Sequence, residues 1–275
     1  MRLCIQNLYR TMFENHPYGF NLFGTEESIQ KLNRDDLVAW YKRYFVNNRI
    51  IISVVGDVSK KSVEESISEY FGKTIREKTG DIELQTPGLG GVKSKIETRE
   101  KRQTSLSIGF KCPGVKHEDF FALTVMDEIL SGMGGRLFIN LRDRDYLGYI
   151  IHSYFDPCYD AGAYWIFLGI PPEREEEAFQ KTFAELQIIK TSPVNEKELS
   201  DAKSAIIGNR LIDLQHNSVL ALEYAKREML QQRDLSETVF AQKIQMIKAE
   251  DIMRVANEYF DFENYALSII RPQNK

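Results

Sequence analysis

The sequence predicts an α+β fold with a mainly antiparallel sheet. Strand-like runs occur in two adjacent pairs, at 92–99 with 103–111 and at 148–156 with 161–170. A run of helical segments then follows instead of another strand. The regular alternation of strand and helix that a doubly wound parallel sheet needs is absent. These observations favour α+β over α/β.

Length and composition agree with a globular protein. The 275 residues suggest two domains or one large one, and 43% are hydrophobic, enough for a sizeable core. The 36 basic and 40 acidic residues give a net charge of −4, so no nucleic-acid partner is expected. No apolar run approaches the roughly 20 residues of a membrane span, and residues 1–13 lack the apolar centre of a secretory signal.

The first part of the chain is mostly helical. Residues 25–45 carry apolar side chains at helical spacing and predict two helices, the second capped by Asp35 or Asp36. The β-branched run at 49–58 predicts a strand. Ser59 then caps a helix that ends at Gly72.

Residues 73–91 lack periodicity and end in Thr-Pro-Gly-Leu-Gly-Gly, which indicates a linker over 76–91. Beyond it, Leu106, Ile108 and Phe110 alternate as in a half-buried strand. The remaining predicted elements are helices at about 117–131, 136–146, 173–190, 196–214, 218–231, 236–246 and 249–260, and a last strand at about 264–271.

An internal repeat sets the domain organisation. Residues 27–45 align with residues 242–260 at a constant offset of 215, and in both copies an Asn and a strand-like run follow. The identical pairs are Ile29/Ile244, Gln30/Gln245, Asp36/Asp251, Tyr44/Tyr259 and Phe45/Phe260. One unit then spans about 215 residues. We therefore expect residues 1–75 to be the C-terminal part of a first unit, 76–91 a linker, and 92–275 a complete second unit.

The residues that commonly carry chemistry form no local site. His16, His117, His152 and His216 are far apart, and neither HExxH nor HxxEH occurs. The three cysteines, Cys4, Cys112 and Cys158, are equally dispersed and predict reduced thiols. No GxSxG is present, and two glycine-rich stretches lack the ending of a phosphate-binding loop.

The segment 136–155 offers another pattern. Arg136, Arg142 and Arg144 fall in a predicted helix that ends in Tyr-Leu-Gly, and Tyr149 opens the next strand. By residue type alone, Arg142 is a solvated cation at a helix end and Tyr149 a half-buried aromatic residue of a strand.

Two stretches together resemble the insulinase/pitrilysin family of zinc peptidases, the inverzincins, which include the mitochondrial processing peptidases. Residues 16–58, with His-Pro-x-Gly, Gly-Thr-Glu-Glu and Val-Gly-Asp, resemble the end of the catalytic unit, and residues 134–153 resemble the Arg-Leu-Phe stretch of the second unit. The resemblance implies α+β units of a little over 200 residues, paired as clamshell halves, each a mainly antiparallel sheet with helices packed on one face.

The resemblance also implies where the chemistry lies. The family's zinc ligands, HxxEH and a downstream Glu, precede the His-Pro-x-Gly stretch, where only 15 residues stand here and Glu14 is too close to serve. We expect no metal or cofactor in this chain, and zinc in a full-length protein or catalytic partner. Arg142 and Tyr149 match an Arg and a Tyr, seven residues apart, that contact the substrate backbone and stabilise the oxyanion.

The resulting hypothesis is the non-catalytic, substrate-binding half of a zinc-dependent metalloendopeptidase that hydrolyses peptides or small proteins, inactive alone. Its expected partners are a peptide substrate and a zinc-bearing half or chain, in a homo- or heterodimer, with no nucleic acid and no membrane span. The alternative is a degenerate structural subunit that pairs with a separate HxxEH-bearing chain. The compartment stays open, with a soluble protein of the bacterial cytoplasm or periplasm expected.

Overall fold

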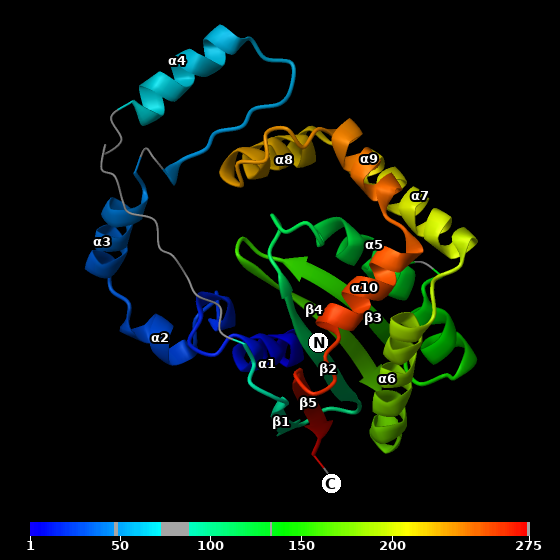
Figure 1. Cartoon of the computed structure of the whole chain (residues 1–275). Coiled ribbons are helices and arrows are strands. Elements are labelled where there is room, and N and C mark those ends of the chain that lie inside the picture. Colours follow the sequence, from blue (N-terminus) through cyan, green and yellow to red (C-terminus); the bar gives the residue numbers. More distant parts are fainter. Residues whose placement is uncertain (47–48, 73–87, 133, 274–275) are drawn as a thin grey trace. The chain divides into compact units, whose positions relative to one another are not determined.

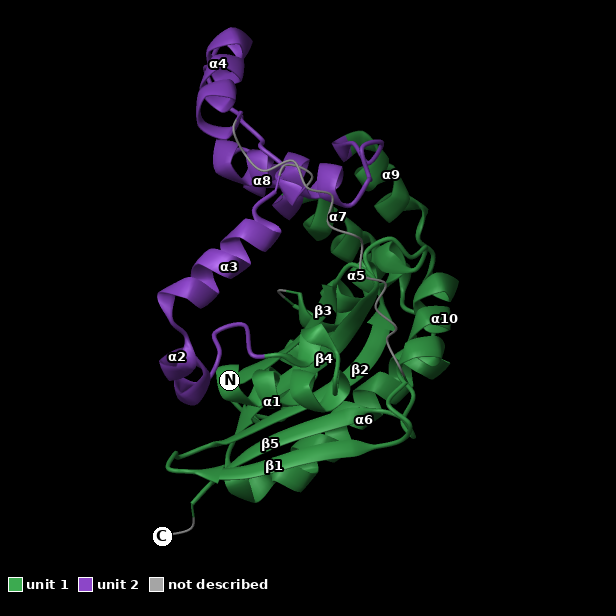
Figure 2. Cartoon of the chain, turned by 90° about the vertical axis from the view of Figure 1, so that its left-hand side faces the viewer, with its two compact units in different colours: residues 1–20, 84–208, 238–275 green, residues 21–83, 209–237 purple. Residues whose placement is uncertain are grey.

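A computed structural model describes residues 1–46, 49–72, 88–132 and 134–273 (Figure 1). The chain forms two compact units (Figure 2). Unit 1 contains residues 1–20, 84–208 and 238–275, and unit 2 contains residues 21–83 and 209–237. Residues 1–20 thus group with the sheet-bearing part of the chain. The division at 75 and 91 inferred from the repeat stays a prediction.

Unit 1 is built on a five-stranded sheet in the order β1-β5-β2-β4-β3. β1 and β5 pair in parallel, and the other neighbours pair antiparallel. The strands are β1 (Lys93–Arg99), β2 (Thr104–Pro113), β3 (Ile150–Pro157), β4 (Ala161–Ile170) and β5 (Ala266–Pro272). The predicted α+β class with a mainly antiparallel sheet is confirmed.

The main helices lie on one face of the sheet, the face to which the side chain of Phe110 points. This ring in β2 lies 5.0 Å from Phe260, which follows α10, and 6.5 Å from Phe183 in α6. The α-helices of unit 1 described beyond β2 are α5 (Phe120–Ser131), α6 (Glu175–Thr191), most of α7 (Glu196–Asp213) and of α9 (Glu237–Met246), and α10 (Ala249–Tyr259). Each lies close to its predicted range.

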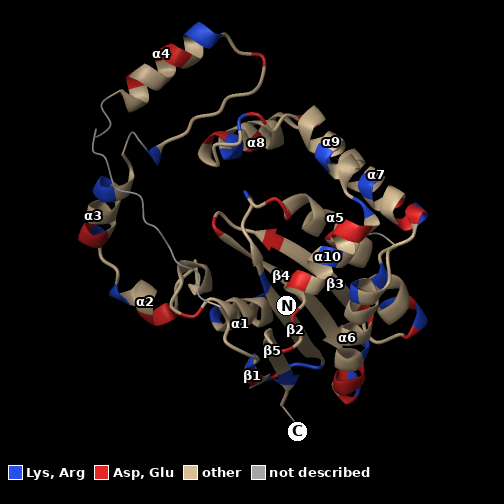
Figure 3. Cartoon of the chain, viewed as in Figure 1, with Lys and Arg blue, Asp and Glu red and all other residues tan. Residues whose placement is uncertain are grey.

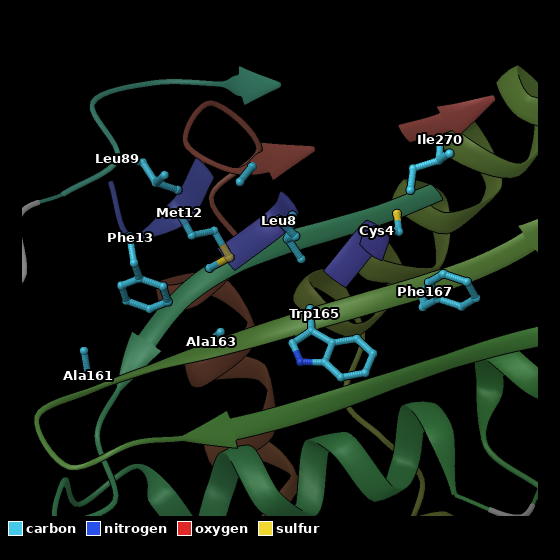
Figure 4. Close-up of a cluster of buried hydrophobic side chains, with 11 residues drawn as sticks. Cys4, Leu8, Met12, Phe13, Leu89, Ala161, Ala163, Trp165, Phe167 and Ile270 are labelled. Carbon is cyan, nitrogen blue, oxygen red and sulfur yellow. The ribbon is translucent and has the colours of Figure 1, made fainter. Parts of the chain in front are cut away.

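The other face of the sheet is covered by α1 (Arg2–Met12), a helix the sequence did not predict (Figure 4). Cys4, Leu8 and Met12 recur every four residues and are buried against the sheet. Successive strand residues point to opposite faces, so Gly109, next to Phe110, faces α1. A Cβ at Gly109 would lie 2.6 Å from the Met12 sulfur and 2.9 Å from Leu8. Glycine therefore permits the close approach of α1.

Unit 2 contains α2 (Glu26–Lys31), α3 (Arg34–Tyr44), α4 (Lys60–Phe71) and α8 (Asn217–Met229). Acidic residues begin α2 and α3 and basic residues end them, as the helix dipole favours (Figure 3). Ser59 caps α4 as predicted. The N-cap residue of α3 is Asn33, which accepts from the backbone N–H groups of Asp35 and Asp36. The predicted Asp36 takes part in the cap, because its carboxylate accepts from the Asn33 N–H.

The predicted strand at 49–58 was wrong. The described residues of this range form no strand, and Ile51, Ile52 and Val54 are 42%, 41% and 49% exposed. A strand needs a neighbour for its backbone hydrogen bonds, and the described part of the chain supplies none here. Most of the predicted linker at 76–91 lies outside the described residues.

Candidate functional site

Arg142 lies in the last turn of a helix, and Tyr149 lies at the end of the connection from that helix to β3, the strand at one edge of the sheet. The helix, η3 (Leu137–Arg144), is a π-helix, in which the Asp145 N–H donates to the Asn140 carbonyl at 3.1 Å. This wider helix is rare in proteins and frequent at functional sites. The sequence predicted a helix here, but not its π geometry.

The guanidinium group of Arg142 faces an aromatic ring instead of a carboxylate. Its central carbon lies 4.4 Å from the centroid of Phe138, one turn earlier. By contrast, Arg136 makes a two-pronged ion pair with Glu198 at 2.7 and 2.8 Å, and Arg144 pairs with Asp145 at 3.1 Å. Among the described residues Arg142 forms no ion pair, and its guanidinium packs on the Phe138 ring.

Tyr149 is 80% exposed immediately before the first residue of β3. The preceding Gly148 lies against the backbone of β4: a Cβ there would be 2.3 Å from the carbonyl oxygen of Gly169. Ordinary contact begins near 3.4 Å, and backbone atoms move less easily than side-chain ends. Glycine at 148 therefore allows the start of β3 to approach β4, and so places the backbone of Tyr149 at the sheet edge.

The turn between the two candidate residues is held from the start of α6. Tyr146 has a positive φ of 51°, which is uncommon for a residue with a bulky side chain. One Nη of Arg174 donates to the carbonyls of Asp145 and Tyr146 at 3.1 and 2.7 Å. Hydrogen bonds from Arg144 and then Lys181 lower the pKa of Asp145. These contacts favour one conformation of the turn.

A buried polar network holds β3 against α5. The hydroxyl of Ser153 donates to Asp127 at 2.6 Å, and the Phe155 N–H donates to the other oxygen of that carboxylate at 3.0 Å. Tyr164 donates to the Ser153 hydroxyl at 2.8 Å, and the Ser153 N–H donates to Ser131 at 2.8 Å. Burial raises the pKa of Asp127. The network fixes the strand that Tyr149 precedes.

Three of the four histidines make contacts typical of structural residues. The ring of His16 accepts from the N–H of Tyr18 in a turn, and the ring of His117 accepts from the N–H of Asp119 before α5. His152 packs among aromatic rings of β4, and burial lowers its pKa. In the part of the chain that the structure describes, no three His, Cys, Asp or Glu residues are grouped so as to hold a metal ion.

The three cysteines are free thiols. Cys4 and Cys112 are buried, and burial raises the pKa of both. Cys158 is half-buried, and burial raises its pKa to about 11. A raised pKa leaves less thiolate, so all three are poor nucleophiles. Separately, no helix among the described residues is long and apolar enough to cross a membrane.

The sequence did not identify Arg174 or the Asp127 network. Arg174 lies within the acidic run Glu-Arg-Glu-Glu-Glu at 173–177, which is typical of a helix start and gives no sign of a contact with residues 145–146. Asp127 lies in a buried helix and Ser153 in a strand, 26 residues apart. No local motif links such residues, because only the fold brings them together.

The family of the chain follows from its similarity to known proteins. The family model described as "Peptidase M16 inactive domain" matches residues 31–206. The chain belongs to this family. It is 26% identical over 272 residues to the uncharacterized zinc protease YmxG of Bacillus subtilis, covering 96% of this chain and 64% of YmxG. It is also 26% identical over 271 residues to zinc protease PqqE of Helicobacter pylori, covering 96% of this chain and 61% of PqqE.

Solved structures support the fold of this M16 chain. A protease from Helicobacter pylori gives a TM-score of 0.86 at 23% identity, over 97% of this chain and 65% of that one. A peptidase M16 inactive domain from Pseudomonas fluorescens gives a TM-score of 0.88 at 21% identity, over 99% of this chain and 66% of that one. At such identities the likeness establishes the fold alone. The resemblance to insulinase/pitrilysin peptidases is confirmed at the level of the family.

Proposed function

We propose that this M16 chain is the non-catalytic, substrate-binding half of a zinc-dependent metalloendopeptidase that hydrolyses peptides or small proteins. The observation that carries the proposal is the pair Arg142 and Tyr149. Both match the family's second-unit motif: Arg142 lies in the last turn of η3, and the largely exposed Tyr149 ends the connection from η3 to β3. Arg174 and the Asp127 network hold that connection in place.

The chemistry of the two side chains fits a peptide substrate. A guanidinium group offers several N–H donors and a phenol offers one O–H donor. Directed at a scissile carbonyl, these donors bind its oxygen more strongly as negative charge develops there. A preorganised donor of this kind contributes roughly 3 kcal/mol to the transition state, or about 100-fold in kcat.

The residues present do not fit a zinc site. The sequence lacks HxxEH, and no metal-binding group occurs among the described residues. The hydrolytic centre must then lie in a zinc-bearing half or partner chain, within a homo- or heterodimer. Alone, the chain is expected to bind peptides without cleaving them.

A reconstituted complex tests the proposal. The remainder of YmxG, outside its match to this chain, serves as the probe for the zinc-bearing half. Arg142→Ala is expected to lower peptidase kcat about 100-fold without reducing assembly. Arg99→Ala, an exposed arginine on β1 at the opposite edge of the sheet, is the matched control. Equal activity of the two variants would refute a substrate-binding role.

The alternative is a structural subunit that pairs with a separate HxxEH-bearing chain. The observation in its favour is the apolar surface of α3, where Leu37 and Trp40 are 60% and 65% exposed. Scaffolding alone does not require Arg142 or Tyr149. Full peptidase activity in the Arg142→Ala complex would therefore favour this second function.

A further inference from the structure

The helix η3 ends in a backbone conformation that glycine usually adopts. Tyr146 is the second residue after this helix, and its φ is 51°. The N–H of Leu147 donates back to the Leu141 carbonyl at 2.9 Å and closes the turn. Helices often end at a left-handed residue followed by such a hydrogen bond, and the left-handed residue is usually Gly and sometimes Asn. At Tyr146 a Cβ occupies this unfavourable position.

The ring of Tyr146 does not stabilise the turn by packing. It is 78% exposed, whereas the neighbouring Leu147 is 0% exposed and anchors the turn. In the part of the chain that the structure describes, no aromatic ring lies against Tyr146, and its hydroxyl makes no hydrogen bond. Strained residues of this kind cluster at binding and active sites. The strained backbone and the exposed ring together indicate a contact with another molecule.

The backbone that carries the ring is fixed by residues at the start of α6. Arg174 donates to the carbonyls of Asp145 and Tyr146, and also makes two hydrogen bonds to Glu177 at 2.8 and 2.9 Å. Lys181 pairs with Asp145 at 2.9 Å. These charged groups are therefore engaged in holding the turn. A ring on a fixed backbone loses less conformational freedom when it binds a ligand.

Tyr146 lies close to the candidate site along the chain. Tyr149 follows three residues later, and three residues span at most about 11 Å. Each residue of an extended peptide advances about 3.3 Å. If Tyr149 contacts the scissile carbonyl, Tyr146 can therefore reach a substrate side chain within three residues of it. Ile150, which follows Tyr149, is 47% exposed and adds apolar surface beside the two phenols.

We propose that Tyr146 is a specificity-determining residue, whose ring contacts a large apolar or aromatic side chain of the peptide substrate within three residues of the scissile bond. The inference rests on the proposed function, because it takes Tyr149 as the residue that contacts the substrate backbone. Tyrosine supplies a large, rigid contact surface at low cost in conformational entropy. Aromatic pairs attract each other beyond the effect of buried area. The exposed Ile150 favours an apolar partner over a charged one.

Peptide binding to the full chain tests this preference. The probes are two fluorescein-labelled nonapeptides of Ala, Ser and Gly, one with a central Phe and the other with a central Ala. Fluorescence anisotropy gives the Kd of each. The parent chain should bind the Phe peptide about 5-fold more tightly, and Tyr146→Gly should bind both peptides equally. Equal binding by the parent chain, or the same preference in Tyr146→Gly, would overturn the inference.

Two control variants show whether the ring itself is responsible. Tyr146→Phe keeps the ring at the same backbone position and should keep the preference for the Phe peptide. Tyr70→Ala removes a ring that is 76% exposed on α4, and should leave both affinities unchanged. A preference that disappears in either control would contradict recognition by the Tyr146 ring.

Thermal unfolding gives a second readout, which a purely structural role would move in the opposite direction. Glycine adopts a positive φ without strain, so Tyr146→Gly should raise Tm by about 2–4 °C. A Tm below that of the parent chain would show that the ring stabilises the turn, and would overturn the inference.

The reconstituted complex separates this inference from the proposed function. An unchanged kcat in Arg142→Ala, with the preference for Phe still lost in Tyr146→Gly, would refute the proposed role of Arg142 alone. A lowered kcat in Arg142→Ala, with the preference for Phe retained in Tyr146→Gly, would overturn the role of Tyr146 alone.

Discussion

Replacing Gly148 by alanine adds one methyl group where β3 meets β4. The new Cβ would lie 2.3 Å from the carbonyl oxygen of Gly169 and 3.0 Å from Cγ2 of Ile170. The shorter contact involves backbone, so relief requires the start of β3 to move by about 1 Å, the shortfall from ordinary van der Waals contact. The variant should therefore be less stable, and its Tyr149 displaced.

The expected loss follows from overpacking. Forced insertion of a methyl group into a packed site costs about 1–3 kcal/mol. For a domain of 150–250 residues, each kcal/mol shifts Tm by about 2–4 °C. The Gly148→Ala chain should thus melt about 2–12 °C below the parent chain.

Gly208→Ala is the matched control, because it makes the same chemical change inside α7, where the new methyl group meets no atom within 4 Å beyond its chain neighbours and the nearby backbone of its own helix. Alanine favours a helix over glycine by about 0.5–1 kcal/mol, so this variant should melt about 1–4 °C above the parent. Differential scanning calorimetry measures both. A Gly148→Ala chain as stable as the parent would refute the claim that backbone contact requires glycine there.

Three further predictions concern the surroundings of the site. Burial raises the pKa of Asp127, so its contribution to the free energy of unfolding is complete below pH 3.8, the ordinary aspartate pKa, and is lost as pH rises through the raised pKa of the folded state. The free energy of unfolding of Asp127→Asn, measured at a series of pH values, should lack this loss. In the native chain at pH 8, Ellman's reagent should react slowly with Cys158 and should not modify Cys4 or Cys112. Unfolding in guanidinium should make all three thiols reactive. Rapid labelling of Cys112 in the native chain would contradict its burial. Arg174→Met should lower kcat of the reconstituted complex by up to about 100-fold with assembly retained, and an unchanged kcat would show that the turn needs no support from α6.

Sequence patterns predicted the strands correctly where the segment is both buried and paired with neighbouring strands in the structure. The alternation of Leu106, Ile108 and Phe110 placed β2 within two residues of its bounds, because this strand is paired on both sides. Residues 51–55 carry an equally strong β signal and form no strand. Propensity is local, whereas pairing depends on a neighbouring strand, and none is available to this segment in the described structure. The sequence did not predict α1 for the same reason, because the burial of this helix depends on Gly109, a residue far along the chain.

Only the residues of the candidate site that belong to a sequence motif could be predicted. The spacing of Arg142 and Tyr149 within a family-like stretch is readable from sequence. The π-helix that carries Arg142 leaves no such signal, because its side chains resemble those of an ordinary helix. Arg174 donates to the carbonyls of Asp145 and Tyr146, which lie 29 and 28 positions earlier in the chain, and only the folded chain brings these residues together.

The most direct test of the central claim is the kcat of a reconstituted complex that carries Tyr149→Phe, at saturating peptide and equal zinc content. This substitution removes one hydroxyl from a side chain that is 80% exposed, so folding and assembly should be retained. Tyr154→Phe, also exposed and on β3, the strand that Tyr149 precedes, is the control. We expect Tyr149→Phe alone to lower kcat about 100-fold. Equal kcat values for the two variants would contradict a role for this chain in the transition state.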